Sequence, residues 1–226
     1  MISVAIDGPA GAGKSTMAKG VAEKFGYIYV DTGALYRTIG LYVMRKGVDT
    51  TDAEGVTNLL SDINIDLKFE NNTQQVILNG ENVSNLIRTP EVSMAASNVS
   101  AIPAVRSYLF DLQKNMAVKH DVIMDGRDIG TVVLPNADVK IFLTASPEER
   151  ANRRFKEMIE KGQSVTYEDV LNDIKRRDYN DSNREIAPLK PAEDAIALDT
   201  TFYTLEESIE KIENIIKEAI HIKETY

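Results

Sequence analysis

The chain has 226 residues, a net charge of −9 and 43% hydrophobic residues. A chain of this length and apolar content can bury a substantial core, which argues against wholesale disorder. The acidic balance argues against a protein that binds nucleic acid or an acidic membrane through a broad basic face. Because the sequence has no cysteine, it has no disulfide framework, thiol nucleophile or thiolate metal site.

The N-terminal segment does not have the pattern of a secretory signal peptide. It lacks a basic stretch, and Asp7 interrupts its apolar run. No apolar run approaches the roughly 18 residues that a membrane-spanning helix needs. We therefore expect a cytoplasmic protein that binds neither membrane nor nucleic acid.

The segment Gly8–Ser15 fits the pattern G-x-x-x-x-G-K-[ST] at every position. The apolar run Ile2–Asp7 before it is typical of a buried strand, and Met17–Lys24 after it is typical of a helix. In this pattern backbone N–H groups converge on phosphate oxygens, the lysine reaches the outer phosphates and the hydroxyl meets Mg²⁺. We expect a nucleoside triphosphate to contact Gly8, Pro9, Ala10, Gly11, Ala12, Gly13, Lys14, Ser15 and Thr16.

Five short apolar runs alternate with helical segments along the chain. They are Ile2–Asp7, Tyr27–Asp31, Val122–Asp125, Val139–Ala145 and Ala195–Asp199. None alternates strictly, as expected for strands covered on both faces, and the alternation with helices predicts a parallel α/β core. Four of the runs end in Asp, at the carboxyl edge where ligands bind in such sheets.

The segment Asp31–Arg37 follows the second predicted strand. Thr32 and Arg37 could both face phosphates from the start of a helix, whose N-terminus also favours anions. An equally good interpretation makes Arg37 an ordinary surface residue of that helix.

Residues 63–83 depart from the α/β pattern. Ile63, Ile65, Leu67 and Phe69 alternate with polar residues, and Asn71-Asn72 and the hairpin dipeptide Asn79-Gly80 follow. This pattern predicts a small antiparallel insert. An edge hairpin of the main sheet is the alternative.

The segment Asp125–Thr131 follows the third strand of the predicted core. A carboxylate at this place commonly orients Mg²⁺ or its waters, which makes Asp125 a metal candidate together with Ser15. Arg127 can clamp a phosphate with two N–H groups, and Asp128 can accept a hydrogen bond from an amino group. The alternative is a polar turn with a local ion pair.

The second half of the chain has strong helix-start signals. Ser146 with Pro147, and Thr166 with Asp169, predict helices that end near Lys161 and Arg184, and Thr204 begins a last amphipathic helix. Arg150, Arg153 and Arg154 share a face of the first helix, near a possible hinge at Gly162. Arg177, Asp181 and Arg184 share a face of the second. Solvated, salt-bridged helix faces are the alternative for both sets.

Phosphoryl transfer gives these arginines a common purpose. Its transition state spreads negative charge over equatorial oxygens and needs the donor and acceptor in line. The protein contributes mainly positioning and electrostatic stabilisation, for which the fixed fork and permanent charge of arginine are suited.

The motifs together resemble the bacterial cytidylate kinase family from Ile2 to about Thr200. The resemblance is carried by D-G-P-x-G-A-G-K-S, D-T-G-A-L-Y-R, M-D-G-R-D-I-G-T-V-V, V-K-I-F-L-T-A-S and R-R-D-x-x-D-S-N-R. It implies one P-loop kinase unit (1–226) with a five-stranded parallel core and helices on both faces. The core would comprise residues 1–36, 100–149 and 171–226, with a monophosphate-binding region at 37–99, its antiparallel insert near 63–83 and a helical lid at 150–170.

The resemblance also implies roles for individual residues. The CMP phosphate would contact Thr32, Arg37 and Arg127. Cytosine would be read by Ser97, Arg106 and Asp128, and the sugar by Arg177 and Asp181. Lys14, Arg127 and Arg184 would be catalytic, and Arg150, Arg153 and Arg154 would belong to the lid. Ala10 stands where some members carry serine, which leaves only backbone contacts there.

The implied reaction moves a phosphoryl group from MgATP to CMP or dCMP in a monomeric enzyme. Another acceptor, such as UMP, AMP or shikimate, is the nearest alternative. A GTPase switch is disfavoured because the chain has no N-K-x-D motif. A structural protein with a vestigial P-loop is disfavoured by the intact Lys14-Ser15 pair.

Overall fold

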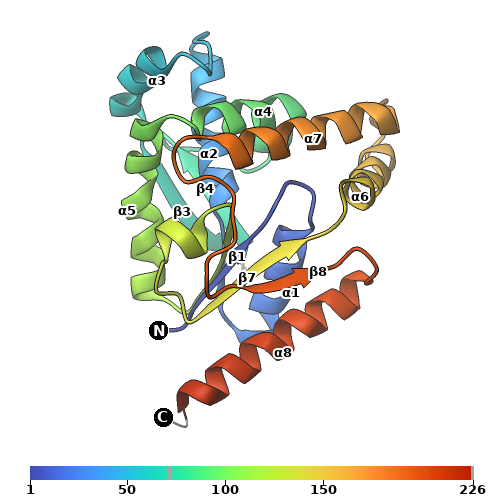
Figure 1. Ribbon diagram of the computed structural model, residues 1–226. Helices are drawn as coiled ribbons and strands as arrows, with labels where there is room; N and C mark the ends of the chain where they lie inside the picture. Colours follow the sequence, from blue (N-terminus) through green and yellow to red (C-terminus); the bar gives the residue numbers. More distant parts are fainter. Residues whose placement is uncertain (71–72, 225–226) are drawn as a thin grey trace.

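The computed structural model describes residues 1–70 and 73–224. Its centre is a five-stranded sheet in the order β2-β6-β1-β7-β8, in which every neighbouring pair is parallel (Figure 1). The strands are β1 (Ser3–Asp7), β2 (Ile28–Asp31), β6 (Val122–Gly126), β7 (Val139–Thr144) and β8 (Ile196–Asp199). All five predicted strands are therefore confirmed.

Helices connect the strands and cover the sheet. The α-helices are α1 (Lys14–Phe25), α2 (Thr32–Arg45), α3 (Ala53–Leu59), α4 (Pro90–Val99), α5 (Pro103–Lys119), α6 (Pro147–Glu160), α7 (Tyr167–Asn183) and α8 (Leu205–Glu224). Short helical turns are η1 (Leu60–Asp62), η2 (Leu86–Arg88) and the π-helical η3 (Ile129–Val133).

Both faces of the sheet are buried at the strands β1, β6 and β7, as expected for a parallel sheet, whereas the edge strand β8 is mostly exposed. On one face α1 and α8 pack against β1 and β7, where Ile212 and Ile216 of α8 are fully buried against Ile6 and Ile141. On the other face Met124 packs with η3 and α5. Each fully buried isoleucine contributes about 1.5–3 kcal/mol, so this packing explains why the apolar strand residues need not alternate with polar ones.

The predicted helix starts are confirmed by their caps. The Ser146 hydroxyl accepts a hydrogen bond from the Glu149 N–H at 3.2 Å, and the Thr166 hydroxyl accepts one from the Asp169 N–H at 3.1 Å. Thr204 caps α8 in the same way. These bonds satisfy N–H groups that the first turn of a helix leaves without partners.

The antiparallel segment forms a separate three-stranded sheet, not an edge of the main one. Its order is β3-β4-β5, with β3 (Ile65–Glu70), β4 (Thr73–Leu78) and β5 (Glu81–Asn82). Positive φ angles at Asn79 (49°) and Gly80 (86°) confirm the hairpin turn there. The predicted Asn71-Asn72 turn lies outside the described residues.

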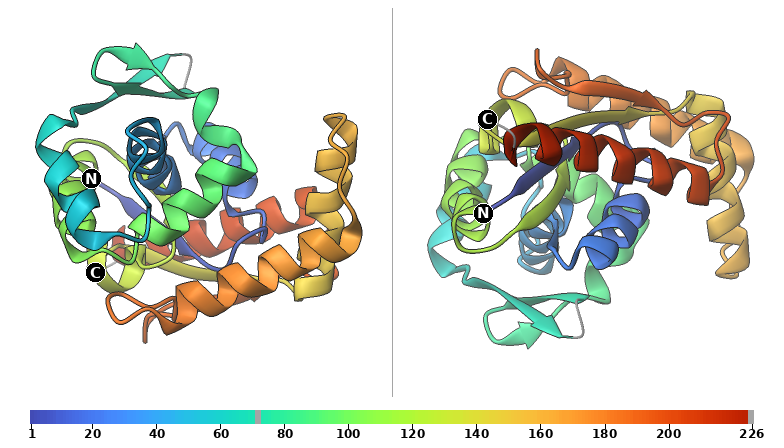
Figure 2. Two further views of the ribbon diagram at one scale, coloured as in Figure 1. Left: turned by 90° about the horizontal axis from the view of Figure 1, so that it is seen from above. Right: turned by 90° about the horizontal axis from the view of Figure 1, so that it is seen from below.

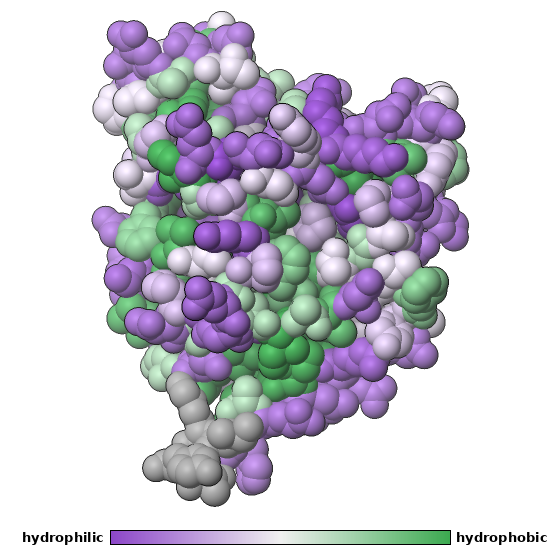
Figure 3. Space-filling view, viewed as in Figure 1, coloured by the Kyte–Doolittle hydropathy of each residue, from purple (hydrophilic) through white to green (hydrophobic). Residues whose placement is uncertain are grey.

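The insert and the α6–α7 pair project on different sides of the core when the molecule is seen from above (Figure 2). On the face shown in Figure 3, hydrophobic side chains gather low, around β8 and α8. Ile196 of the edge strand β8 is 45% exposed. In the part of the chain that the structure describes, no helix is long and apolar enough to cross a membrane.

Gly8 generates the first prediction, because the chain passes very close to β7 there. A Cβ on Gly8 would lie 1.9 Å from the carbonyl oxygen of Leu143. We expect Gly8→Ala to lower the free energy of unfolding by about 3 kcal/mol or more, measured by urea denaturation. Gly26→Ala is the control, since its Cβ would meet nothing within 4 Å and only its left-handed φ of +69° is unfavourable. Its expected loss is about 1 kcal/mol, and equal losses would contradict the steric explanation.

Candidate active site

A cavity of about 880 Å³ lies at the carboxyl edge of the sheet. The P-loop forms one wall, and the start of α2, the loop after β6 and the helices α4, α6 and α7 form the others. Strand-end acids Asp31 and Asp125 line it, but Asp7 and Asp199 do not. The strand-end prediction is therefore right for two of the four acids. Asp199 instead accepts a hydrogen bond from the Thr201 hydroxyl at 2.6 Å.

Lys14 occupies the P-loop wall and is 5% exposed. Its ammonium group donates a hydrogen bond to the carbonyl oxygen of Pro9 at 2.7 Å. Burial, together with the positive charge of Arg127, lowers the pKa of Lys14 to about 7. A phosphate in the cavity would favour the charged lysine, because an opposite charge nearby raises the pKa of an amine.

Most of the other residues expected to contact the nucleoside triphosphate also line the cavity. Residues from Ala10 to Met17 line the cavity, including Gly11, Ala12, Gly13, Ser15 and Thr16. Gly8 and Pro9 lie behind this wall and are not among the lining residues.

Ser15 and Asp125 lie together at the base of the P-loop. The Ser15 hydroxyl donates to Asp125 Oδ2 at 2.9 Å, and the Tyr29 hydroxyl donates to Asp125 Oδ1 at 2.9 Å. Burial and the nearby Asp31 raise the pKa of the Asp125 carboxyl. Two such oxygen ligands fit Mg²⁺, which usually takes few protein ligands and completes its shell with phosphates and water. Sequence reasoning missed Tyr29, which positions Asp125.

No described group of three or more acidic or histidine side chains could hold a metal without such a substrate.

The end of β2 gathers two arginines around one buried carboxylate. Asp31 accepts from Arg37 at 2.7 Å and lies 3.1 Å from Arg88. It also caps α2 by accepting from the Ala34 N–H at 2.9 Å. Burial opposes ionisation, but Arg37 and Arg88 hold the pKa of Asp31 below its usual range. Arg37 and Arg88 both line the cavity, and sequence reasoning missed Arg88.

The insert reaches this same strand end through Gln74. Its side-chain oxygen accepts from the Asp31 N–H at 2.9 Å, and its amide nitrogen donates to the Asp31 carbonyl at 3.3 Å. The antiparallel sheet is thereby tied to the residue that holds Arg37 and Arg88.

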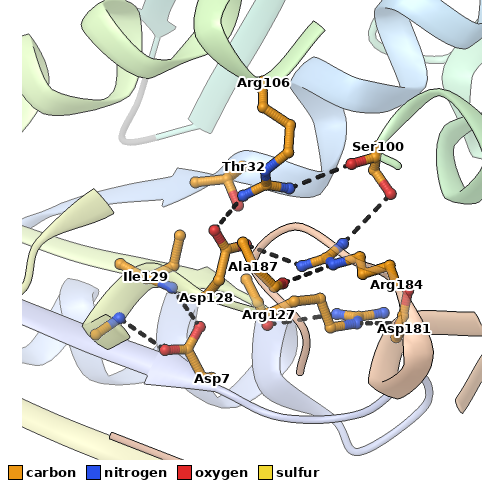
Figure 4. A network of polar contacts seen from close by, with 12 residues as sticks. Asp7, Thr32, Ser100, Arg106, Arg127, Asp128, Ile129, Asp181, Arg184 and Ala187 are labelled. Carbon is orange, nitrogen blue, oxygen red and sulfur yellow. Dashed lines mark hydrogen bonds and ion pairs between the residues drawn. The ribbon is translucent and has the colours of Figure 1, made fainter. Parts of the chain in front are cut away.

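The loop after β6 carries a basic and an acidic residue, Arg127 and Asp128, and each is paired with a side chain of opposite charge. Arg127 donates to Asp181 of α7 at 2.7 Å, and Asp128 is bonded to Arg106 of α5 and to Arg184 at 3.2 Å (Figure 4). Arg127, Asp128, Asp181 and Arg184 line the cavity, whereas Arg106 lies behind Asp128. Burial opposes ionisation of Asp181, but Arg127 holds its pKa below the usual range.

Buried polar atoms without partners gather around this cavity. Among the described residues they are Arg37 Nε, Ser97 Oγ, Gln113 Oε1, Thr131 Oγ1 and Arg177 Nε. All of these residues except Thr131 line the cavity. Since a buried polar atom without a partner costs about 1–3 kcal/mol, their gathering at one place indicates a ligand site. Sequence reasoning missed Gln113, which is 1% exposed on α5.

Thr32 also lines the cavity, at the first residue of α2. It is 2% exposed, and its hydroxyl donates to the carbonyl oxygen of Asp125 at 2.7 Å. The start of α2 therefore lies against the end of β6, as the proximity of two strand ends predicts.

The three arginines expected in the lid are not equivalent. Arg153 and Arg154 line the cavity from α6. Arg150 does not line it: it is 3% exposed and donates to the carbonyl oxygen of Ala10 at 2.8 Å and to Asp178 Oδ2 at 2.6 Å. Its guanidinium thus ties the P-loop to α7, a connection that helix periodicity alone cannot predict.

Comparison with known proteins identifies the family. The sequence model of the cytidylate kinase family matches residues 4–218. The chain is 53% identical to a cytidylate kinase of Caldicellulosiruptor saccharolyticus over 93% of each chain. It is 51% identical to one of Clostridium tetani over 99% of this chain and 96% of the other.

A solved gluconokinase from Sinorhizobium meliloti shares the fold. It has a TM-score of 0.50 and 14% identity, with 99% of this chain and 97% of the other covered. The fold, the phosphate-binding loop and the full-length matches agree, and the chain belongs to the cytidylate kinase family of ATP-dependent phosphotransferases.

Proposed function

We propose that this protein transfers the γ-phosphoryl group of MgATP to the phosphate of CMP or dCMP, which gives ADP and CDP or dCDP. The observation that carries the proposal is a single cavity with the P-loop on one wall and Arg37, Arg127, Arg177 and Arg184 on the others. Two anions that repel each other need this arrangement to meet end to end.

The donor would lie along the P-loop wall. Its backbone N–H groups and the Lys14 ammonium would hold the β- and γ-phosphates, which requires the lysine to leave the Pro9 carbonyl. Ser15 and Asp125 would hold Mg²⁺, which when bound neutralises phosphate charge. The hydrogen bond between the Ser15 hydroxyl and the Asp125 carboxylate supports this metal assignment, because it shows that the two oxygens lie close enough to hold one cation.

The acceptor phosphate would bind between Thr32, Arg37 and Arg127. Arg37 keeps its Nε free of any partner although the atom is buried, so it can donate to a phosphate without leaving Asp31. Arg177, whose Nε is also unpaired, and Asp181 would bind the sugar.

The cytosine ring would be read at Asp128. This carboxylate could accept a hydrogen bond from the exocyclic amino group while Ser97 donates to a ring acceptor. Arg106 lies behind Asp128 in the ligand-free cavity and would have to turn toward the ring to donate as well. Uracil presents a carbonyl oxygen in place of the amino group, and two acceptors would then face each other. Such a mispairing costs about 1–3 kcal/mol, which is roughly tenfold or more in affinity.

In the transfer step Lys14, Arg127 and Arg184 would stabilise the charge on the moving phosphoryl group, which passes directly from donor to acceptor oxygen. Arg153 and Arg154 on α6 would approach the phosphates as the α6–α7 pair closes, and closure would exclude water that otherwise hydrolyses ATP. We expect the enzyme to act as a monomer in the cytoplasm, on these small molecules alone.

A kinase of the same fold with another acceptor is the second candidate. Steady-state kinetics with CMP, dCMP, UMP, AMP and shikimate as acceptors tests the proposal. CMP or dCMP should have the highest kcat/KM, and a higher value for any other acceptor would overturn it.

Lys14→Ala generates a prediction about catalysis. Because Lys14 is buried and its charged form is disfavoured, its loss should leave the melting temperature within a few degrees of the native value. The loss of its contact to the transferring phosphate should lower kcat at least about 100-fold in a coupled ADP-release assay. Lys19→Ala, on the exposed face of the same helix, is the control and should keep its turnover. Native turnover in Lys14→Ala would refute the donor assignment.

Asp128→Asn tests base recognition. An amide in place of the carboxylate can donate to the uracil carbonyl, so the ratio of kcat/KM for CMP to that for UMP should fall at least about tenfold. The measurement is acceptor kinetics at saturating MgATP. Asp194→Asn, which alters an ion pair with Lys140 outside the cavity, is the control. An intact preference in Asp128→Asn would move base recognition to other residues.

Removal of Mg²⁺ should stop the reaction without unfolding the protein. Ser15 and Asp125 already bond to each other, so the folded state does not depend on the cation. Excess chelator should therefore abolish turnover and leave the melting temperature of the nucleotide-free protein unchanged. Added Mg²⁺ should restore turnover, and activity that persists in chelator would contradict the metal assignment.

A further inference from the structure

Asp7 is a buried acid that takes no part in the proposed reaction and does not line the cavity. It ends β1, one residue before the P-loop begins, and is 5% exposed. Its two carboxylate oxygens accept hydrogen bonds from successive backbone N–H groups of η3: Oδ1 from Ile129 at 2.8 Å and Oδ2 from Gly130 at 2.7 Å. Figure 4 shows Asp7 reaching this turn from below the loop.

Both N–H groups belong to the first turn of η3, which leaves them without helical partners, and the side chain of the preceding residue usually satisfies the one at the second position, here Gly130. Here that residue is Asp128, a residue type that favours this position. Its side chain nevertheless makes no capping hydrogen bond. It points the other way, toward Arg106 and Arg184 (Figure 4).

Two carboxylates thus have different partners at this turn. Asp7, on a neighbouring strand, satisfies the backbone, and Asp128 is turned to the cavity. Without Asp7, Asp128 itself could accept from the Gly130 N–H, two residues on, by the local side-chain to backbone bond that aspartate forms readily.

The charges around Asp7 show what holds it in place. Burial raises its pKa to about 6, and the nearby Asp128 also raises it, whereas the two backbone N–H groups and Lys14 lower it. The Lys140 side chain packs beside Asp7 over Gly130, where a Cβ would lie 3.2 Å from Lys140 Cδ and 3.4 Å from Asp7 Oδ2, but its ammonium group is paired with Asp194. The backbone N–H groups of η3 are therefore the main partners of this carboxylate.

We propose that Asp7 is a positioning residue: by capping η3 from β1, it keeps the Asp128 carboxylate turned toward the acceptor end of the cavity. This role rests on the proposed function, since it is through Asp128 that Asp7 would influence the choice of base. It also links the strand that starts the P-loop to the loop that carries Arg127.

The test is Asp7→Asn, compared with Asp121→Asn. In Asp7→Asn the side-chain amide would offer one acceptor oxygen, and its NH₂ group would face the second N–H donor. Asp121 is the matched control, because its Oδ1 accepts from the Ile2 N–H at 2.6 Å near the other end of β1, away from the cavity. Each variant changes one aspartate whose carboxylate accepts a hydrogen bond from a backbone N–H group, and both contacts lie at an end of β1.

In Asp7→Asn the ratio of kcat/KM for CMP to that for UMP should fall about tenfold or more, while the KM for ATP stays within about twofold. Asp121→Asn should keep both values. An unchanged ratio of kcat/KM for CMP to that for UMP in Asp7→Asn would overturn the proposal. So would a KM for ATP that rises as much as the KM for CMP. A purely structural role of Asp7 predicts one or the other of these two results.

Hydrogen exchange separates this proposal from the proposed function. In ligand-free Asp7→Asn the amide of Ile129, which Asp128 cannot cap, should exchange about tenfold faster than in the native protein, and unchanged exchange would overturn the role of Asp7 whichever acceptor is used. Failure of the native protein to phosphorylate CMP would overturn only the proposed function.

A measurement on the native protein covers the case in which Asp7→Asn does not fold. Scalar couplings across hydrogen bonds should connect the Asp7 carboxyl carbon to the amide nitrogens of Ile129 and Gly130 in NMR spectra. Their presence would support the cap in solution, and their absence would overturn it.

Discussion

Pairing between arginine and buried aspartate at the carboxyl edge of the sheet is the interaction on which the cavity depends. Asp31 holds Arg37 and Arg88, Asp128 holds Arg106 and Arg184, and Asp181 holds Arg127. Without these acids the guanidinium groups would repel one another, and their burial would be unfavourable. The pairs explain how several arginines can be held close together around one cavity in a chain with a net charge of −9.

The same pairs leave the arginines able to bind a ligand. A guanidinium group has five N–H donors, and one or two bonds to a carboxylate leave others free. The unpaired Nε atoms of Arg37 and Arg177 are examples. A phosphate can therefore add to an arginine that is already oriented, and little side-chain entropy is lost on binding.

Several long-range contacts connect the walls of the cavity. Arg150 links the Ala10 carbonyl of the P-loop to Asp178 of α7, and Gln74 links the insert to Asp31. These contacts join α7 and the insert to Ala10 and Asp31, which line the cavity. In the proposed reaction this linkage would couple closure around the acceptor to alignment of the donor.

The sequence by itself determined the strands, the helix starts, the phosphate-binding loop and the family, because these depend on residues close together in the chain. Capping by Ser146 or the turn at Asn79-Gly80 is a local matter of backbone hydrogen bonds and φ angles. The comparisons confirm the family resemblance, and the roles assigned to individual site residues stay predictions.

Tertiary structure decided which side chains meet. It made the antiparallel segment a separate sheet, put Arg150 behind the P-loop, and brought Tyr29, Arg88 and Gln113 to the site. The contact between Tyr29 and Asp125 spans 96 residues, and that between Arg150 and Ala10 spans 140. Local patterns carry no information about such pairs, because a buried charge takes whichever partner the packing of strands and helices brings within hydrogen-bond distance.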